Sequence, residues 1–182
     1  EPMPPAYAVQ RSADSETAGG IAFLVTAPLM YGLGVPLSLA GNNAWRHGCA
    51  PNTPTDVCAR GSTQSILAHT GTGLLYVTGM VFAGVGGRKL GIARAIRDRE
   101  AGIRRQRATG LMTAGAVVLP LSLVGAGMAR LFYWLPTPEC EEAQCVRYYQ
   151  QASTFMVGGL AFTAAIGAMM LGYGTGYNKQ AR

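Results

Sequence analysis

The chain has 182 residues, of which 13% are charged and 49% are hydrophobic, and its formal net charge is +6 at pH 7. The charged share is about half that of a typical soluble domain, which argues against a water-soluble globular protein. Because most of the positive excess lies in one short segment, the charge indicates anionic lipid headgroups rather than nucleic acid as its partner.

Four apolar stretches without Asp, Glu, Lys or Arg occur in the chain. They run at about Ala18–Ala40, Ser65–Gly87, Ala108–Ala129 and Ala152–Tyr177. A hydrocarbon core about 30 Å thick is crossed by about 20 helical residues, and each stretch meets that length. We therefore expect an all-α integral membrane protein, in which residues 1–182 form a single domain with four spans in an antiparallel bundle.

The second and third stretches are joined by a basic segment, Arg88–Arg107, which holds eight of the 15 Lys and Arg residues. Short loops rich in Lys and Arg stay in the cytoplasm. The pattern therefore predicts a bacterial inner-membrane protein with both termini in the cytoplasm and the other two loops outside. A signal peptide removed before Glu1 would reverse this orientation, and we expect the charge pattern to decide.

The isoleucines and arginines of the basic segment are spaced as on a helix lying on the membrane surface. We expect seven of its cations to bind anionic lipid headgroups, unless they are simply solvated helix charges. These seven are Arg88, Lys89, Arg94, Arg97, Arg104, Arg105 and Arg107.

The four cysteines fall as two pairs in the two predicted outer loops. Cys49 and Cys58 lie in the first loop, and Cys140 and Cys145 lie in the third. An oxidising compartment favours disulfides between cysteines placed in this way. We expect one disulfide in each loop, although four cysteines allow three pairings.

The two halves of the chain share an order of features. Val35–Gly41 and Leu119–Gly125 both contain Pro-Leu-Ser-Leu, and each precedes a cysteine pair and a glycine-rich span. This order predicts two duplicated helical hairpins of the same orientation. The alternative is chance recurrence of Leu, Ser and Gly in apolar sequence. Pro36 and Pro120 are expected to kink their helices.

His69 is the ionisable residue, other than tyrosine, that lies well inside a span. Such groups are functional candidates, although a neutral histidine bonded to Thr70 or Thr72 is the simpler interpretation. The spans offer no second histidine for haem and no carboxylate for an ion path. We predict no catalytic residue, no metal and no cofactor.

Small residues four apart recur in the second and fourth spans. The pairs are Ala83 with Gly87, Ala168 with Gly172, and Gly172 with Gly176. Small residues at this spacing allow another helix backbone to approach closely. We expect helix contacts at these positions, either within the bundle or with a partner subunit.

The overall layout resembles the disulfide bond formation protein B family, which has four spans, cytoplasmic termini and a cysteine pair in each outer loop. That resemblance implies electron transfer from thiols to quinone, with Arg60 as a basic residue near the quinone. The family's first pair is a CxxC motif, whereas eight residues separate Cys49 from Cys58 here.

The absence of catalytic residues, together with many helix-contact positions, predicts a non-enzymatic accessory or scaffolding subunit of a larger membrane complex. Its expected partners are membrane lipids and other membrane-protein subunits, and not nucleic acid. A small carrier or lipid-binding protein is the first alternative. A quinone-linked thiol oxidoreductase is the second.

Overall fold

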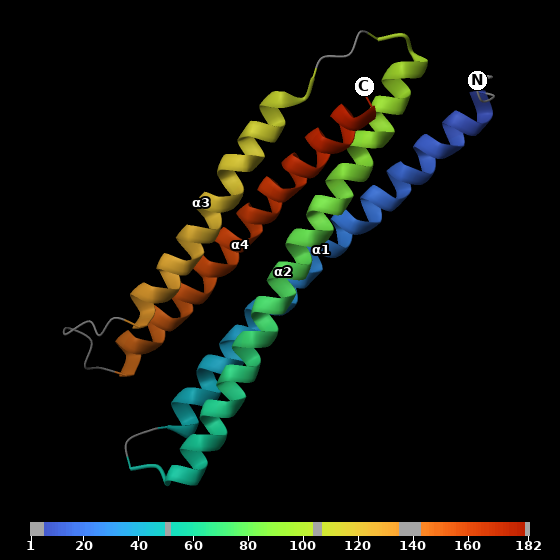
Figure 1. Cartoon of the computed structure of the whole chain (residues 1–182). Coiled ribbons are helices and arrows are strands. Elements are labelled where there is room, and N and C mark those ends of the chain that lie inside the picture. Colours follow the sequence, from blue (N-terminus) through green and yellow to red (C-terminus); the bar gives the residue numbers. More distant parts are fainter. Residues whose placement is uncertain (1–5, 50–51, 104–106, 135–142, 181–182) are drawn as a thin grey trace.

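The chain folds as four long helices, drawn in Figure 1 from a computed structural model that describes residues 6–49, 52–103, 107–134 and 143–180. The helices are α1 (Ala6–Gly48), α2 (Thr55–Glu100), α3 (Thr109–Trp134) and α4 (Ala143–Gln180). All four are long and apolar enough to cross a membrane. This confirms the predicted all-helical chain with four candidate membrane spans.

The basic segment does not form a separate loop or a surface helix over most of its length. Helix α2 continues from the apolar stretch through Arg88 as far as Glu100, a total of 46 residues. The predicted span ends at Gly87 because the sequence becomes polar there. A helix can nevertheless continue through such a change in polarity. Ala, Leu, Arg and Lys are all favourable helix formers, so the backbone continues where the apolar run ends.

A glycine just beyond the last residue of α2 terminates the helix. Gly102 has a φ of 65°, and its N–H donates to the Arg99 carbonyl oxygen at 3.3 Å. The next N–H, of Ile103, donates to the Asp98 carbonyl oxygen at 3.0 Å. This pair of hydrogen bonds with a left-handed glycine is the Schellman motif, which ends helices because a side chain is disfavoured at that φ.

Most of the hydrogen bonds found for threonine hydroxyls within the helices are local. Seven threonines donate to the carbonyl oxygen four residues earlier: Thr17, Thr26, Thr63, Thr72, Thr113, Thr154 and Thr163. Polar groups in a hydrocarbon environment need such internal partners. The polar content of the spans is therefore compatible with lipid.

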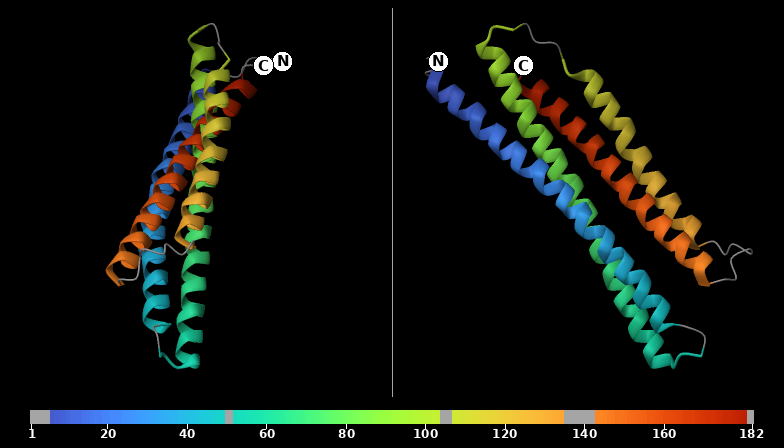
Figure 2. Two further views of the ribbon diagram at one scale, coloured as in Figure 1. Left: turned by 90° about the vertical axis from the view of Figure 1, so that its left-hand side faces the viewer. Right: turned by 180° about the vertical axis from the view of Figure 1, so that it is seen from behind.

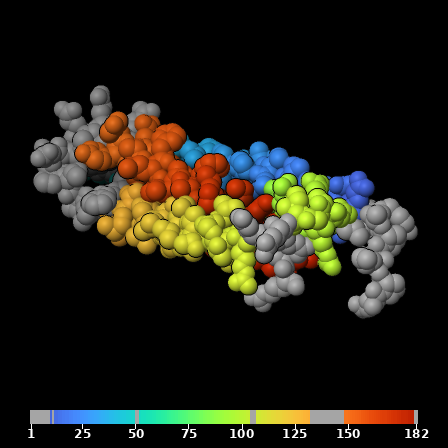
Figure 3. All heavy atoms as spheres, turned by 90° about the horizontal axis from the view of Figure 1, so that it is seen from above, coloured from blue at the N-terminus to red at the C-terminus, as the bar shows by residue number. Residues whose placement is uncertain are grey.

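The helices pack in the order α1, α2, α4, α3. Helix α1 packs along α2, α2 packs along α4, and α4 packs along α3, while α1 also touches α4. Among the described residues, α3 packs on α4 alone. Figure 3 shows α3 and α1 on opposite sides of α4.

The two ends of the molecule differ in chemistry. Both chain ends and the end of α2 lie at one end, which we call the basic end (Figures 1 and 2). The start of α2, the end of α3 and the start of α4 lie at the opposite end, which we call the disulfide end.

The buried core lies between α1, α2 and α4. The rings of Tyr31 and Tyr76 stack with centroids 5.3 Å apart, and the Tyr31 hydroxyl donates to the Tyr76 carbonyl oxygen at 3.1 Å. Phe162 of α4 meets Tyr31 edge to face at 5.7 Å. These aromatic contacts join both hairpins at mid-height, among buried alanines at positions 27, 83, 161 and 165.

Candidate functional site

The predicted small-residue positions meet where α2 crosses α4. Gly87 lies so close to the Met169 backbone that a Cβ there would overlap its carbonyl oxygen. Gly172 and Gly176 lie equally close to the backbones of Gly84 and Arg88. The structure therefore places these glycines at a helix contact within the chain, since only glycine lets two backbones approach so closely.

The two alanines of the pattern flank the same contact. Ala83 is 4% exposed, and Ala168 lies near Gly84, with 3.6 Å between the Ala168 carbonyl oxygen and a Cβ built on Gly84. Because α2 and α4 belong to different hairpins, this crossing is the main connection between the two halves of the molecule.

His69 lies at the interface of α2 with α1, near the disulfide end. Its Nε2 atom is 3.3 Å from a Cβ built on Gly41. Thr72, one of its expected partners, instead donates to the carbonyl oxygens of Ala68 and Gly34.

A buried polar contact between α1 and α4 was not predicted from sequence. The Asn42 side-chain amide donates to the Thr154 hydroxyl at 3.1 Å, and both residues are at most 5% exposed. Asn42 lies two residues beyond the predicted end of the first span at Ala40. Asn42 lies four positions after Ser38, so the two polar residues share one face of the helix, and Ser38 is also buried. This spacing was the sequence signal that could have indicated a buried polar face.

The cations of the basic segment separate into two groups. Three lie in ion pairs: Lys89 with Glu16 at 2.9 Å, Arg97 with Asp14 at 3.1 Å, and Arg94 with Asp98 at 3.0 Å. Arg88 and Arg107 are exposed, and neither forms an ion pair with a described residue. Arg104 and Arg105 lie outside the described residues.

Asp98 is a buried carboxylate within the basic segment, and its burial was not predicted from sequence. It is 6% exposed, it accepts a hydrogen bond from the Tyr177 hydroxyl at 2.8 Å, and it pairs with Arg94. Buried carboxylates are stable only with such partners. The contact joins α2, beyond its apolar stretch, to the last residue of the apolar stretch of α4, so it extends the crossing at the basic end.

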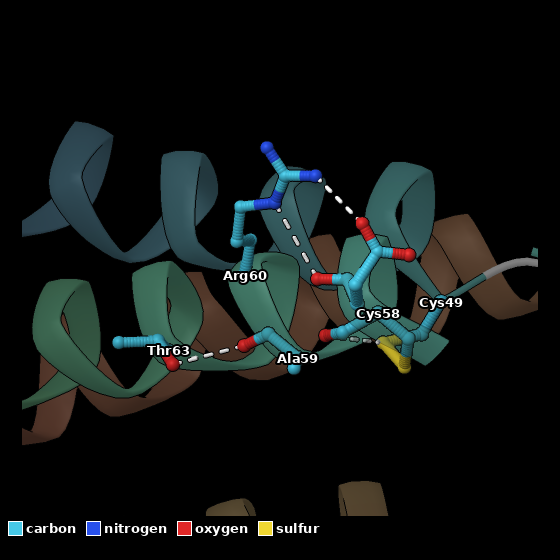
Figure 4. Close-up of a disulfide and its surroundings, with 6 residues drawn as sticks. Cys49, Cys58, Ala59, Arg60 and Thr63 are labelled. Atoms are coloured by element: carbon cyan, nitrogen blue, oxygen red, sulfur yellow. Dashed lines mark hydrogen bonds and ion pairs between the residues drawn. A yellow bond between two sulfur atoms is a disulfide. The ribbon is translucent and has the colours of Figure 1, made fainter. Parts of the chain in front are cut away.

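A disulfide joins Cys49, directly after α1, to Cys58 in the first turn of α2. This confirms the predicted bond in the first loop (Figure 4). The Arg60 guanidinium points away from the sulfur atoms and pairs with Asp56 at 2.9 Å. Cys140 lies outside the described residues and the side chain of Cys145 is not described, so the second disulfide stays a prediction.

Within the described residues, no group of three His, Cys, Asp or Glu side chains is placed to hold a metal ion. The Tyr76 hydroxyl is buried without a hydrogen-bond partner there, beside Gly158 of α4.

Comparisons with known proteins give no relative for this chain: no family model, no curated protein and no solved structure matches it. The function proposed below therefore rests on the residues and on their geometry.

Proposed function

We propose that this chain is a non-enzymatic accessory or scaffolding subunit of a larger complex in a bacterial inner membrane. The observation that carries the proposal is a set of glycines on open helix faces. A Cβ built on any of five helical glycines would meet no atom of the described residues within 4 Å: Gly32, Gly73, Gly110, Gly127 and Gly159.

An unoccupied glycine weakens the helix that contains it. Glycine in a helix costs about 0.5–1 kcal/mol relative to alanine, and the cost is offset where a second backbone packs closely. At the α2–α4 crossing that second backbone belongs to the same chain. At Gly127 of α3 and Gly159 of α4, a helix of another subunit would supply it.

The length of the first hairpin supports the same role. Helix α1 has 43 residues and α2 has 46, so at 1.5 Å per residue they are about 65 and 69 Å long. A hydrocarbon core is about 30 Å thick, so both helices extend well beyond it. A rigid hairpin with a disulfide at its tip offers contact surface to partners outside the bilayer.

The placement of the ends supports the predicted orientation and the antiparallel arrangement. All eight cations of the basic segment precede α3 and follow the apolar part of α2, and the disulfide lies at the opposite end. We propose that the basic end is cytoplasmic and the disulfide end periplasmic. The order α1, α2, α4, α3 is unchanged when the two hairpins are exchanged, which supports the proposed duplication.

The test is purification of the full chain in a gentle detergent, followed by mass spectrometry of whatever remains bound in a fixed ratio. We expect stoichiometric membrane-protein partners. Recovery of the chain alone, or as a homodimer, would contradict the proposal and favour a carrier.

A matched pair of variants on α3 sharpens the test. Gly127→Leu adds a side chain on an open glycine face, and we expect it to reduce partner recovery at least tenfold. Val124→Leu, at a position that is 64% exposed, adds one methylene to an ordinary lipid-facing site and should leave recovery unchanged. Equal recovery with both variants would show that the glycine face is not a partner site.

A further inference from the structure

The hydroxyl of Tyr76 is a polar group inside the junction of the two hairpins, and no described residue satisfies it. Tyr76 is 6% exposed, and its hydroxyl oxygen has no hydrogen-bond partner among the described residues. The stacked Tyr31 differs, because its hydroxyl donates to the Tyr76 carbonyl oxygen at 3.1 Å. A buried hydroxyl without a partner destabilises the folded state, and it does so most where hydrocarbon surrounds the protein. The Tyr76 hydroxyl therefore calls for a partner.

There is room for such a partner beside a glycine of the other hairpin. A Cβ built on Gly158 of α4 would lie 3.2 Å from the Tyr76 hydroxyl oxygen and 3.2 Å from Val35 Cγ2. No third heavy atom of a described residue lies within 4 Å of that position, leaving aside the chain neighbours of Gly158 and its own helix backbone within four residues. Gly158 is nevertheless buried. The junction is therefore open beside the Tyr76 hydroxyl, whereas backbone atoms fill the corresponding position at Gly172.

Ser38 of α1 brings a second hydroxyl to the same level. It lies four residues after Gly34, which packs against the Tyr76 ring, and four residues before Asn42. Residues four apart share one helix face, and Ser38 is buried on that face. A helical serine can donate to the carbonyl oxygen four residues earlier. Here the Gly34 carbonyl oxygen accepts from the helix backbone and from the Thr72 hydroxyl at 3.2 Å, so both of its lone pairs are used and Ser38 is left to donate elsewhere.

Thr154 of α4 brings a third hydroxyl. It lies four residues before Gly158 on the same helix face and is 2% exposed. Its hydroxyl donates to the Gln150 carbonyl oxygen at 2.9 Å and accepts from the Asn42 side-chain amide at 3.1 Å. A hydroxyl oxygen has two lone pairs, so one acceptor position remains. Helices α1, α2 and α4 therefore each contribute one hydroxyl around the open space beside Gly158.

We propose that a buried water molecule binds beside Gly158 and is held by the hydroxyl groups of these three helices. The Tyr76 and Ser38 hydroxyls donate to the water oxygen, and the water donates to the remaining lone pair of Thr154. Buried waters make about three hydrogen bonds of this kind to groups that the protein leaves unsatisfied. Ordering one water costs little in comparison with a hydroxyl that stays unpaired inside the protein.

The surroundings favour water over other occupants. A metal ion needs charged ligands to leave water, and the four apolar stretches contain no Asp or Glu. A larger molecule is disfavoured because the Tyr76 hydroxyl and Val35 both lie 3.2 Å from the open position. The junction then has two halves: direct backbone contact at the glycine crossing, and a contact mediated by water toward the disulfide end. This site is independent of the subunit role proposed above.

The sign of a stability change tests the site. Tyr76→Phe removes only the hydroxyl, and denaturant titration of the full chain in detergent micelles measures the result. With a bound water, the equilibrium constant for folding should fall about tenfold, because the bridge between the helices is lost. Removing a hydroxyl that has no partner would instead stabilise the protein. An equilibrium constant that rises or stays unchanged therefore overturns the proposal.

A double-mutant cycle tests whether the three hydroxyls share one water. Once Tyr76→Phe has released it, Ser38→Ala has less to remove, so the double variant should lose less than the product of the two single losses, by about threefold or more. Ser122→Ala is the matched control: Ser122 is also 6% exposed, but it lies on α3, which packs on α4 alone among the described residues. Its effect should multiply independently with that of Tyr76→Phe. Independence of Ser38→Ala would exclude a shared water.

Radiolytic footprinting detects the water itself. X-ray radiolysis activates a bound water in place, and mass spectrometry then measures the oxidation of each tyrosine in the full chain. Tyr31 is the matched internal control, since it is also 6% exposed and is stacked on Tyr76. We expect Tyr76 to be oxidised several times faster than Tyr31. Equally slow oxidation of the two rings would overturn the proposal.

Discussion

The two hairpins are built on the same order of sequence features but are held together differently. In the first, α1 and α2 are joined by a disulfide at one end, by the ion pairs of Lys89 and Arg97 at the other, and by stacked tyrosines between. In the second, the described contacts of α3 with α4 include hydrogen bonds and glycines such as Gly115 and Gly167, whose added Cβ atoms would overlap backbone atoms of the facing helix, as those of Gly48 and Gly61 would in the first.

The difference shows how flanking residues determine the reach of a membrane hairpin. Helix α3 has 26 residues, close to the length needed for one crossing, whereas α1 and α2 have 43 and 46. Outside lipid, a helix pair loses the hydrocarbon environment that favours helical backbone. The first hairpin replaces it with ion pairs at one end and a covalent bond at the other, and so remains helical.

The largest expected effect comes from separating the hairpins at their crossing. In Gly172→Ala, the new Cβ would overlap the Gly84 carbonyl oxygen, a rigid backbone atom. We expect a loss of about 3 kcal/mol or more in the free energy of unfolding, measured by denaturant titration in detergent micelles. The matched Gly159→Ala faces open space and should gain up to about 1 kcal/mol. Equal stabilities would mean that the crossing does not hold the hairpins together.

Removal of the disulfide tests what the first hairpin gains from its covalent bond. The variant with both Cys49→Ser and Cys58→Ser loses a bond between cysteines nine positions apart, and loop closure of this length contributes about 2–3 kcal/mol. The same unfolding titration measures the loss. Adding reductant to this double variant then isolates Cys140 and Cys145. A further drop in stability would reveal the second disulfide, and an unchanged curve would contradict that prediction.

A smaller loss is expected when the hydrogen bond between α4 and the buried carboxylate of α2 is removed. Tyr177→Phe deletes the donor to Asp98, and hydrogen bonds to charged groups contribute about 1.5–3 kcal/mol. Tyr173→Phe is the matched control, because the Tyr173 ring stacks on Tyr177 and the change again removes only a hydroxyl. It should change stability by less than about 0.5 kcal/mol. A cycle with Asp98→Asn that shows no coupling would refute the assignment.

The smallest effect concerns the ion pairs at the basic end of the first hairpin. Glu16→Gln removes the carboxylate that pairs with Lys89, whose side chain is 34% exposed, and should cost about 0.5 kcal/mol. Hydrogen exchange of residues 10–20 should become about twofold faster at low salt and unchanged at high salt. Asp56→Asn, which breaks the exposed pair with Arg60 at the other end, should leave this region unaffected. An effect of Glu16→Gln that persists at high salt would exclude the ion pair as its cause.

Much of the candidate site was visible in the sequence as residue types, but not as partners. The spacing of Gly172 and Gly176 predicted a helix contact, because small residues four apart share a helix face, and both glycines lie against the backbone of α2. The pairing of α4 with α2 at that face was not readable, since the same spacing serves a contact within the chain or with a partner. The burial of Asp98 and Asn42 was not predicted, because burial depends on which helix lies opposite a residue. A single amino-acid sequence does not show which helices are neighbours.

The sequence by itself determined the number of membrane helices and their approximate positions. An apolar run long enough to cross the hydrocarbon core has to satisfy its backbone hydrogen bonds internally, and a helix does so within one segment. It also indicated a disulfide in the first loop but left three pairings of the four cysteines open, and the structure decided the bond between Cys49 and Cys58. Only the tertiary structure decided the neighbours among the described residues: α2 packs against α4, α3 packs on α4 alone, and Lys89, Arg94 and Arg97 pair with carboxylates. The physical reason is the separation in sequence between the residues that interact. Helix formation is governed by contacts four residues apart, whereas ion pairing joins residues 83 positions apart, as in Asp14 and Arg97, and packing joins residues 112 positions apart, as in Asn42 and Thr154.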